Sequence, residues 1–123
     1  MTKIIVVDDD KAATALFEQV LLMNDYEVFA LNESSKTIEL ADTVHPDLFI
    51  LDLMMPEPDG FKLCRMLRTN PNFRRTPIII VTALNDVDSR LVAIGAGAND
   101  YLVKPFHIDE LYTVIEHQLN KNK

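Results

Sequence analysis

Five short apolar runs, separated by stretches with helical spacing, constrain the fold of this 123-residue chain more than any other feature. Each run is rich in Val, Ile, Leu or Phe, and together they occupy residues 3–7, 26–31, 47–51, 78–81 and 101–103. Strands that are apolar on both faces are typical of parallel sheets covered by helices. The pattern therefore predicts an α/β fold, a doubly wound five-stranded parallel sheet built from five βα units with right-handed crossovers.

Helical spacing and helix-end signals fill the stretches between these runs. In residues 11–23, apolar side chains that include Leu16 and Phe17 fall on one helical face, which predicts the first helix. In the fourth predicted helix, Val87, Leu91 and Ile94 form an apolar stripe that is expected to face the sheet. The candidate N-caps are Asp10 for the first helix, Ser34 or Ser35 for the second and Asp59 for the third, and the expected stop of the fourth is Gly95 with Gly97.

Composition excludes several classes of protein and predicts one domain over residues 1–123. The formal net charge is −7, which argues against direct nucleic-acid binding because that needs clustered Lys and Arg. No apolar run approaches the ~20 residues of a membrane span, and the N-terminus does not resemble a signal peptide. The single cysteine, Cys64, can form neither an internal disulfide nor a thiolate zinc site, and we expect it to be buried and inert. The cytoplasm is the expected compartment.

Polar residues follow four of the five predicted strands, at the point where each strand ends. Three aspartates at 8–10 follow the first strand, and Asp52 follows the third. Thr82 comes at the end of the fourth strand, and Lys104 follows the fifth. Because the carboxyl ends of parallel strands meet at one edge of the sheet, we expect these side chains to converge in a single shallow site.

Carboxylates gathered at one edge repel each other unless their pKa values rise or a cation binds between them. One lysine cannot neutralise three acids, whereas Mg²⁺ takes one or two carboxylates together with waters and a phosphate. The pattern therefore predicts a site for a metal ion and a transferable phosphoryl group, with Asp52 as the nucleophile. Lys104 and Thr82 are placed to hold the phosphoryl oxygens.

Four motifs, in this order, resemble those of the receiver domain of two-component response regulators, the CheY-like family. They are Asp8-Asp9, then Asp52-Leu53-Met54-Met55-Pro56 with Asp59-Gly60, then Thr82-Ala83, and last Tyr101-Leu102-Val103-Lys104-Pro105-Phe106. The resemblance extends over nearly the whole chain. It implies a flavodoxin-like strand order of 2-1-3-4-5 and a part in two-component or phosphorelay signal transduction.

The resemblance also implies a role for each site residue. Asp52 would accept a phosphoryl group from a histidine kinase or a histidine phosphotransfer protein and form an acyl phosphate. Asp9, Asp52 and the backbone carbonyl of Met54 would bind Mg²⁺, and Asp8 would act mainly through a bound water. Lys104 would pair with the phosphoryl group. Such a domain is a signalling phosphoacceptor rather than an enzyme acting on other substrates.

Thr82 and Tyr101 would form the switch in a domain of this family. Thr82 would move to hydrogen-bond the phosphoryl group, and Tyr101 would follow inward. These interactions would bias the face made of the fourth helix, the fifth strand and the fifth helix toward partner binding. The Lys104-Pro105 peptide bond is cis in the family, which only an X–Pro bond adopts at low cost.

Two further positions bear on how long the phosphorylated state lasts. In the family, the residue two after the phosphorylated aspartate and the residue two after the threonine influence attack by water. Here these positions hold Met54 and Leu84, neither of which can orient a water molecule. We therefore expect slow self-dephosphorylation.

Three other functions remain alternatives on the sequence alone. A flavin- or nucleotide-binding protein of this topology would offer Ser, Thr and Gly amides to a phosphate where this chain has aspartates. A phosphatase of the haloacid dehalogenase type would carry an acid two residues after its nucleophile, where this chain has Met54. A purely structural receiver would not bind Mg²⁺.

The output of the domain has two alternatives. It is either a single-domain shuttle that acts on a separate effector protein, or the N-terminal receiver of a longer regulator. In the second case the fused output domain would bind DNA or synthesise cyclic-di-GMP. A homodimer formed on phosphorylation is a further expected assembly.

Overall fold

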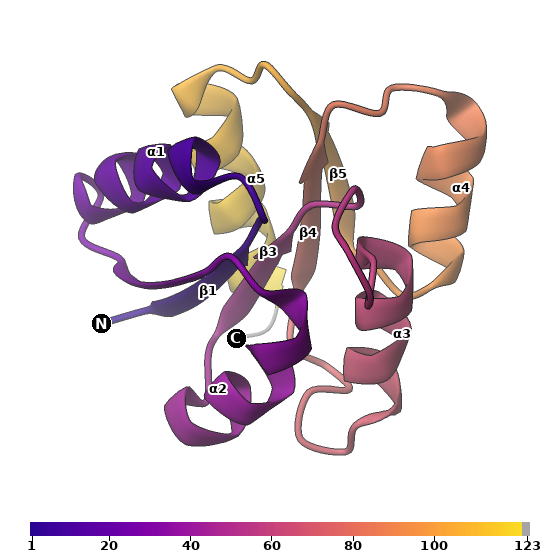
Figure 1. The fold of residues 1–123 in the computed structure, drawn as a ribbon. Helices are drawn as coiled ribbons and strands as arrows, with labels where there is room; N and C mark the ends of the chain where they lie inside the picture. Colours follow the sequence, from indigo (N-terminus) through magenta and orange to yellow (C-terminus); the bar gives the residue numbers. More distant parts are fainter. Residues whose placement is uncertain (122–123) are drawn as a thin grey trace.

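A computed structural model describes residues 1–121 as a parallel sheet between two layers of helices (Figure 1). All strand pairs are parallel, and the strand order is β2-β1-β3-β4-β5, so the predicted fold class and topology are confirmed. In chain order the elements are β1 (Lys3–Val7), α1 (Lys11–Leu22), β2 (Glu27–Leu31), a 3₁₀ turn (Ser34–Lys36), α2 (Thr37–Val44), β3 (Leu48–Leu51), α3 (Gly60–Thr69), β4 (Ile78–Thr82), α4 (Val87–Gly95), β5 (Asp100–Val103) and α5 (Ile108–Lys121).

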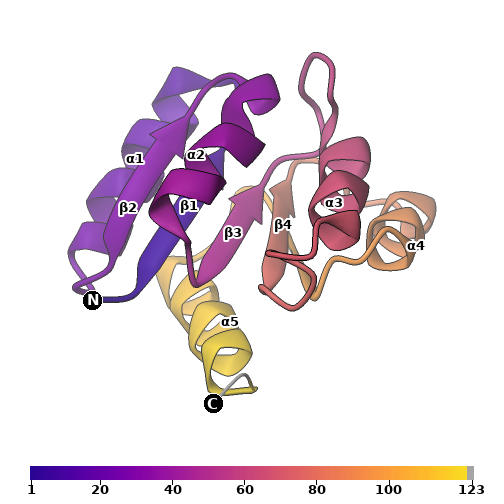
Figure 2. The same ribbon diagram turned by 90° about the horizontal axis from the view of Figure 1, so that it is seen from below.

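Alternate residues of each central strand enter different cores, one on each face of the sheet. Ile5 and Val7 face the core under α2, α3 and α4, whereas Ile4 and Val6 face the core under α1 and α5. Figure 2 shows α5 on one side of the sheet and α3 on the other. Burial on both sides explains why the strands are continuously apolar in the sequence.

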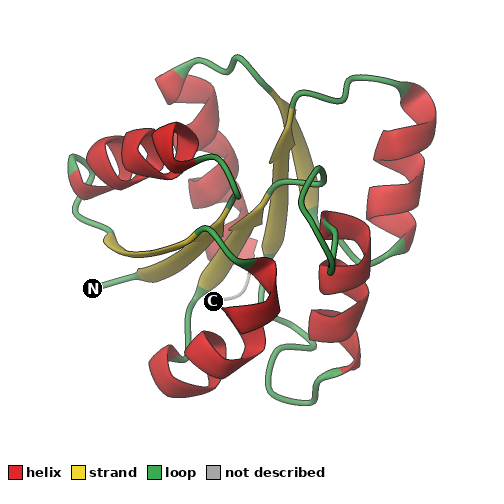
Figure 3. Ribbon diagram, viewed as in Figure 1, coloured by secondary structure: helices red, strands yellow, loops and turns green. Residues whose placement is uncertain are grey.

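The strand register brings the strand ends together at one edge of the sheet, where the green loops leave the yellow strands (Figure 3). Val7 pairs with Leu51, so the residues that follow β1 and β3 are neighbours. Thr82 pairs with Val103, and the Lys104 amide donates to the Thr82 carbonyl over 2.8 Å. The topology thus places the ends of β1, β3, β4 and β5 around one site.

Helix capping follows the sequence signals, except at α2. The carboxylates of Asp10 and Asp59 accept hydrogen bonds from the backbone amides two and three residues later, as expected of N-caps. The prediction that Ser34 or Ser35 is the N-cap of α2 is wrong. Lys36 occupies the N-cap position, and its side chain makes no capping hydrogen bond. The Ser34 hydroxyl instead contacts the carbonyls of the 56–58 loop.

Two predicted apolar faces are oriented differently from the expectation. Leu16 on α1 is 48% exposed, and the stripe of Val87, Leu91 and Ile94 on α4 faces solvent. Among the residues of α4, the one fully buried side chain is that of Ala93. Periodicity defines a helical face but not the side on which the sheet lies, and here the small side chain packs inward.

Arg68 ties together the opposite edge of the sheet, far from the strand ends described above. Its Nε donates to the Gly97 carbonyl over 2.8 Å, and one terminal nitrogen donates to the carbonyls of Phe73 (2.9 Å) and Thr76 (2.7 Å). The Asn99 side chain accepts a further hydrogen bond from Arg68 and one from the Ile78 amide. Gly97 has φ +113°, and a Cβ there would overlap the Arg68 side chain.

Cys64 lies on α3 in the core, fully buried as expected. Burial raises the pKa of its thiol to about 11, with the charges of Arg68 and Arg65 acting in the opposite direction. Since the thiolate is the reactive form, this cysteine is a packing residue.

Candidate functional site

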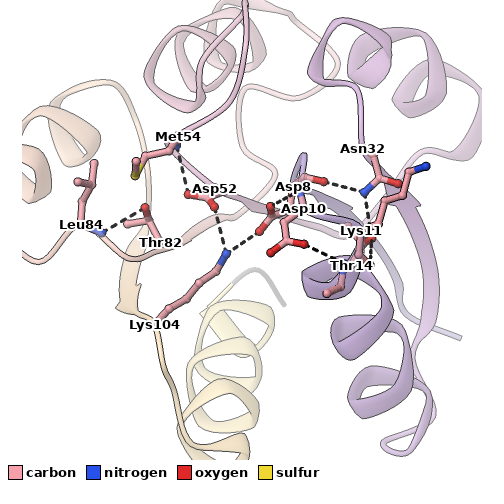
Figure 4. Close-up of polar contacts among 11 residues, drawn as sticks. Asp8, Asp10, Lys11, Thr14, Asn32, Asp52, Met54, Thr82, Leu84 and Lys104 are labelled. Carbon is pink, nitrogen blue, oxygen red and sulfur yellow. Dashed lines mark hydrogen bonds and ion pairs between the residues drawn. The ribbon is translucent and has the colours of Figure 1, made fainter.

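A charged bridge at the strand ends forms the centre of the candidate site (Figure 4). The Lys104 ammonium nitrogen lies 2.6 Å from Asp8 Oδ2 and 3.0 Å from Asp52 Oδ2. The two carboxylates are almost inaccessible, with Asp8 1% and Asp52 9% exposed. Lys104 therefore meets Asp8, which lies 96 positions earlier in the chain, and Asp52, which lies 52 positions earlier, as the topology predicted.

Burial and charge oppose each other at this bridge. Burial raises the pKa of the Asp8 carboxyl, and the nearby Asp52 charge adds to the rise, although the hydrogen bond from Lys104 acts against it. Burial would lower the pKa of Lys104, but its hydrogen bonds to both carboxylates outweigh that effect and the pKa is raised. The site therefore holds two carboxylates that require a cation between them, and Lys104 supplies one positive charge.

Backbone amides fix the second oxygen of each carboxylate. Asp8 Oδ1 accepts from the Asp10 amide over 2.9 Å, and Asp52 Oδ1 accepts from the Met54 amide over 3.2 Å.

The Lys104-Pro105 peptide bond is cis, which agrees with the resemblance to receiver domains, and the Glu57-Pro58 peptide bond is also cis.

Gly60 lets α3 begin directly against the loop that carries Asp52. A Cβ at position 60 would overlap the Asp52 carbonyl oxygen and lie 2.6 Å from the Leu53 Cα. The Gly60 amide donates to the Leu53 carbonyl over 3.0 Å, so the close approach also satisfies a backbone group. Glycine is therefore required here for space rather than for a left-handed backbone.

Thr82 and Tyr101 lie beside the bridge and are linked through Leu84. The Thr82 side chain is fully buried, and its hydroxyl accepts a long hydrogen bond (3.4 Å) from the Leu84 amide. The Tyr101 hydroxyl donates to the Leu84 carbonyl over 2.7 Å, and the Arg90 guanidinium lies 4.8 Å from the centre of the Tyr101 ring. Tyr101 is thus buried in this structure.

Asp9 differs from the other expected ligands. It is exposed, and the bridge is formed by Asp8 and Asp52 alone. Among residues 1–121, no group of three or more His, Cys, Asp or Glu side chains is close enough to hold a metal ion by itself. A metal ion at this edge would need waters or carbonyls as additional ligands.

Asn32 is a site residue that the sequence analysis missed. It directly follows β2, so it stands at a strand end like the other site residues. Its amide nitrogen donates to the Asp8 carbonyl over 2.8 Å and to the Thr14 hydroxyl over 3.0 Å. The same argument from parallel strand ends would have identified it.

Comparison with known families excludes two of the three alternatives left open by the sequence. The family model for the response regulator receiver domain matches residues 4–116. This chain is a response regulator receiver domain. It belongs to the signalling domains of two-component systems, and the flavin-binding and phosphatase alternatives are set aside.

Individual relatives agree with this assignment. The receiver domain is 37% identical over 121 residues to "Response regulator MprA" of Mycobacterium leprae, covering 98% of this chain and 52% of that protein. It is 35% identical to "DNA-binding dual master transcriptional regulator RpaA" of Synechocystis, covering 98% of this chain and 50% of that protein. It therefore spans about half the length of these curated relatives.

A solved structure supports the same fold. A putative response regulator from Chloroflexus aurantiacus is 33% identical and matches the receiver domain with a TM-score of 0.93, over 97% of this chain and 98% of that one.

None of the helices in residues 1–121 is both long and apolar enough to cross a bilayer.

Proposed function

We propose that this receiver domain accepts one phosphoryl group on Asp52 in a Mg²⁺-dependent reaction, from a histidine kinase or a histidine phosphotransfer protein. The observation that supports the proposal is the convergence of the Asp8 and Asp52 carboxylates on one cation, the Lys104 ammonium. The contacts with Lys104 and the Met54 amide hold the Asp52 carboxylate, the proposed nucleophile, in a fixed orientation at the ends of the strands.

The transfer forms one bond and breaks one. An Asp52 carboxylate oxygen bonds to phosphorus, the bond from phosphorus to the donor histidine nitrogen breaks, and that nitrogen takes a proton from solvent. Lys104, already within 3.0 Å of an Asp52 oxygen, then pairs with the new phosphoryl oxygens. The Thr82 hydroxyl, at the neighbouring strand end, donates to another.

The donor set fits Mg²⁺. Two carboxylates already surround one positive charge, and Mg²⁺ commonly binds proteins through one or two carboxylates while keeping several waters. Asp9, Asp52 and the Met54 carbonyl are the ligands we propose, with Asp8 acting through a water. When bound, the ion would neutralise charge on the phosphoryl oxygens during transfer.

The test of this function is phosphorylation by a small acyl phosphate donor, followed by the mass of the intact protein. We expect the mass of one added phosphoryl group when Mg²⁺ is present, and none when a chelator removes the metal. We also expect hydroxylamine to release the group, since it cleaves acyl phosphates. Uptake that is independent of Mg²⁺, or a hydroxylamine-resistant product, would contradict the proposal.

Slow loss of the phosphoryl group is a second expected result. Met54 is 57% exposed and Leu84 is half-buried, so neither offers a polar group to a water near Asp52. We expect Met54→Asn to shorten the lifetime roughly tenfold, because a group that orients water supplies part of what a general base does. The measurement is the decay of phosphoprotein after donor removal, and Met54→Leu is the matched control. Equal lifetimes in both variants would contradict this role of position 54.

Transmission of the signal uses Thr82 and Tyr101. Thr82 can exchange its long hydrogen bond with Leu84 for one with the phosphoryl group, which alters the segment that leads to α4. The energy for any change in the α4–β5–α5 face is limited to the difference in these interactions between the two states. The partner at this face is an effector protein, a second copy of the chain, or a fused output domain.

The length of the relatives favours the role of a receiver in a longer regulator over that of a single-domain shuttle, since the chain spans about half of each of them. The printed name of one relative describes it as DNA-binding, so a DNA-binding output is favoured over cyclic-di-GMP synthesis. We propose a cytoplasmic location for such a regulator, with no direct nucleic-acid contact by the receiver domain itself.

A further inference from the structure

The segment that follows β2 contacts both loops that carry the acidic residues. Asn32 donates to the backbone carbonyl of Asp8, in the loop after β1. Two residues later, the Ser34 hydroxyl lies 2.7 Å from the Pro58 carbonyl and 3.1 Å from the Pro56 carbonyl, in the loop after β3. Asn32 and Ser34 will be called the β2 clamp.

The β2 clamp is anchored and sheltered from solvent. Ser34 is 6% exposed, and Asn32 is half-buried. Asn32 also donates to the Thr14 hydroxyl, which is itself 4% exposed and donates to the Lys11 carbonyl over 3.2 Å. Asn32 is therefore tied to α1 as well as to the loop after β1, and Ser34 to the loop after β3.

We propose that Asn32 and Ser34 are positioning residues that set the distance between the Asp8–Asp9 loop and the Asp52–Met54 loop, and with it the affinity for Mg²⁺. The proposal rests on the proposed function. Ligands contributed by two separate loops bind a metal tightly only when outer contacts hold those loops at the correct spacing. The Lys104 bridge joins the same two loops through their carboxylates, whereas the β2 clamp joins them through their backbones.

The chemistry of the clamp requires hydrogen-bond donors at both positions. The Asn32 amide faces a carbonyl oxygen, so Asn32→Asp keeps the shape but opposes that oxygen with a carboxylate. Ser34→Ala removes the hydroxyl, whereas Ser34→Thr retains it. Ser35 lies next to the clamp and is exposed, so Ser35→Asp matches the added charge and Ser35→Ala matches the lost hydroxyl.

The experiment is a Mg²⁺ titration of the full chain followed by backbone amide NMR shifts. We expect Asn32→Asp and Ser34→Ala to weaken Mg²⁺ binding by about tenfold. Ser34→Thr and both Ser35 variants should remain within about twofold of the wild type. Phosphorylation by the small donor should need more Mg²⁺ for half-maximal rate in the clamp variants, with little change in the rate at saturating Mg²⁺.

A metal-free readout separates positioning from general damage to the fold. Hydrogen exchange at the Asp10 amide, which donates to Asp8 Oδ1, should become faster in the clamp variants, while exchange in the core strands stays unchanged. Wild-type protein that binds no Mg²⁺ would contradict the proposed function. Wild-type protein that binds Mg²⁺, together with clamp variants of unchanged affinity or an equal loss of saturated rate, would overturn the β2 clamp alone.

Discussion

Asp52→Asn is expected to abolish phosphoryl uptake, with less than about a hundredth of the wild-type rate remaining. The amide has no carboxylate oxygen with which to attack phosphorus. The fold should survive, because Lys104 keeps its 2.6 Å contact with Asp8 and an amide oxygen can still accept from the Met54 amide. The measurement is the mass of the intact protein after incubation with donor and Mg²⁺.

Asp59→Asn is the control for this experiment. Asp59 lies in the same loop and caps α3 through the Lys62 amide at 2.9 Å, and Asn caps helices as well as Asp does. We expect normal uptake in this variant and an unchanged melting temperature. Labelling of Asp52→Asn at the wild-type rate would mean that another residue accepts the phosphoryl group.

Arg68→Ala is expected to cause the largest loss of stability. It would leave the carbonyls of Gly97, Phe73 and Thr76 without their charged donor. Unsatisfied groups of this kind cost about 1–3 kcal/mol when buried, and solvent can reach part of this half-buried cluster, so we expect a total of about 2–3 kcal/mol. Chemical denaturation measures the loss directly, and the melting temperature should fall by roughly 10 °C.

Arg65→Ala is the matched control, because Arg65 lies one turn earlier on α3 and is exposed. Its loss should change stability by less than about 0.5 kcal/mol. Arg68→Lys should recover only part of the loss, since an ammonium cannot reach several acceptors in the planar arrangement of a guanidinium. Equal effects of Arg65→Ala and Arg68→Ala would contradict the role assigned to this cluster.

The sheet could be predicted from the sequence because its signal is local. A strand buried on both faces must be apolar throughout, so each strand can be recognised from its own short run of residues.

The apolar stripe of α4 is a case that local spacing could not decide. The spacing of Val87, Leu91 and Ile94 identified a common face, but only the packed structure shows that Ala93 faces the core.

The site could be predicted in part, for a related reason. Strand ends in a parallel sheet share an edge, so the meeting of Asp8, Asp52 and Lys104 followed from topology. The place of Asn32 at a strand end follows from the same topology, but its partner and those of Arg68 do not, because each of these side chains reaches backbone carbonyls of segments distant in the chain. A carbonyl is present at every residue, so the sequence does not mark which ones will accept such a bond.

The attachment of α4 has a consequence for signalling. A helix that commits one alanine to the interior, and leaves its large side chains in water, loses little apolar contact when it is displaced. The segment that leads into this helix contacts both expected switch residues, because Leu84 donates to the Thr82 hydroxyl and accepts from the Tyr101 hydroxyl. Under the proposed function, α4 is thus a helix that phosphorylation of Asp52 would displace with little loss of buried apolar area.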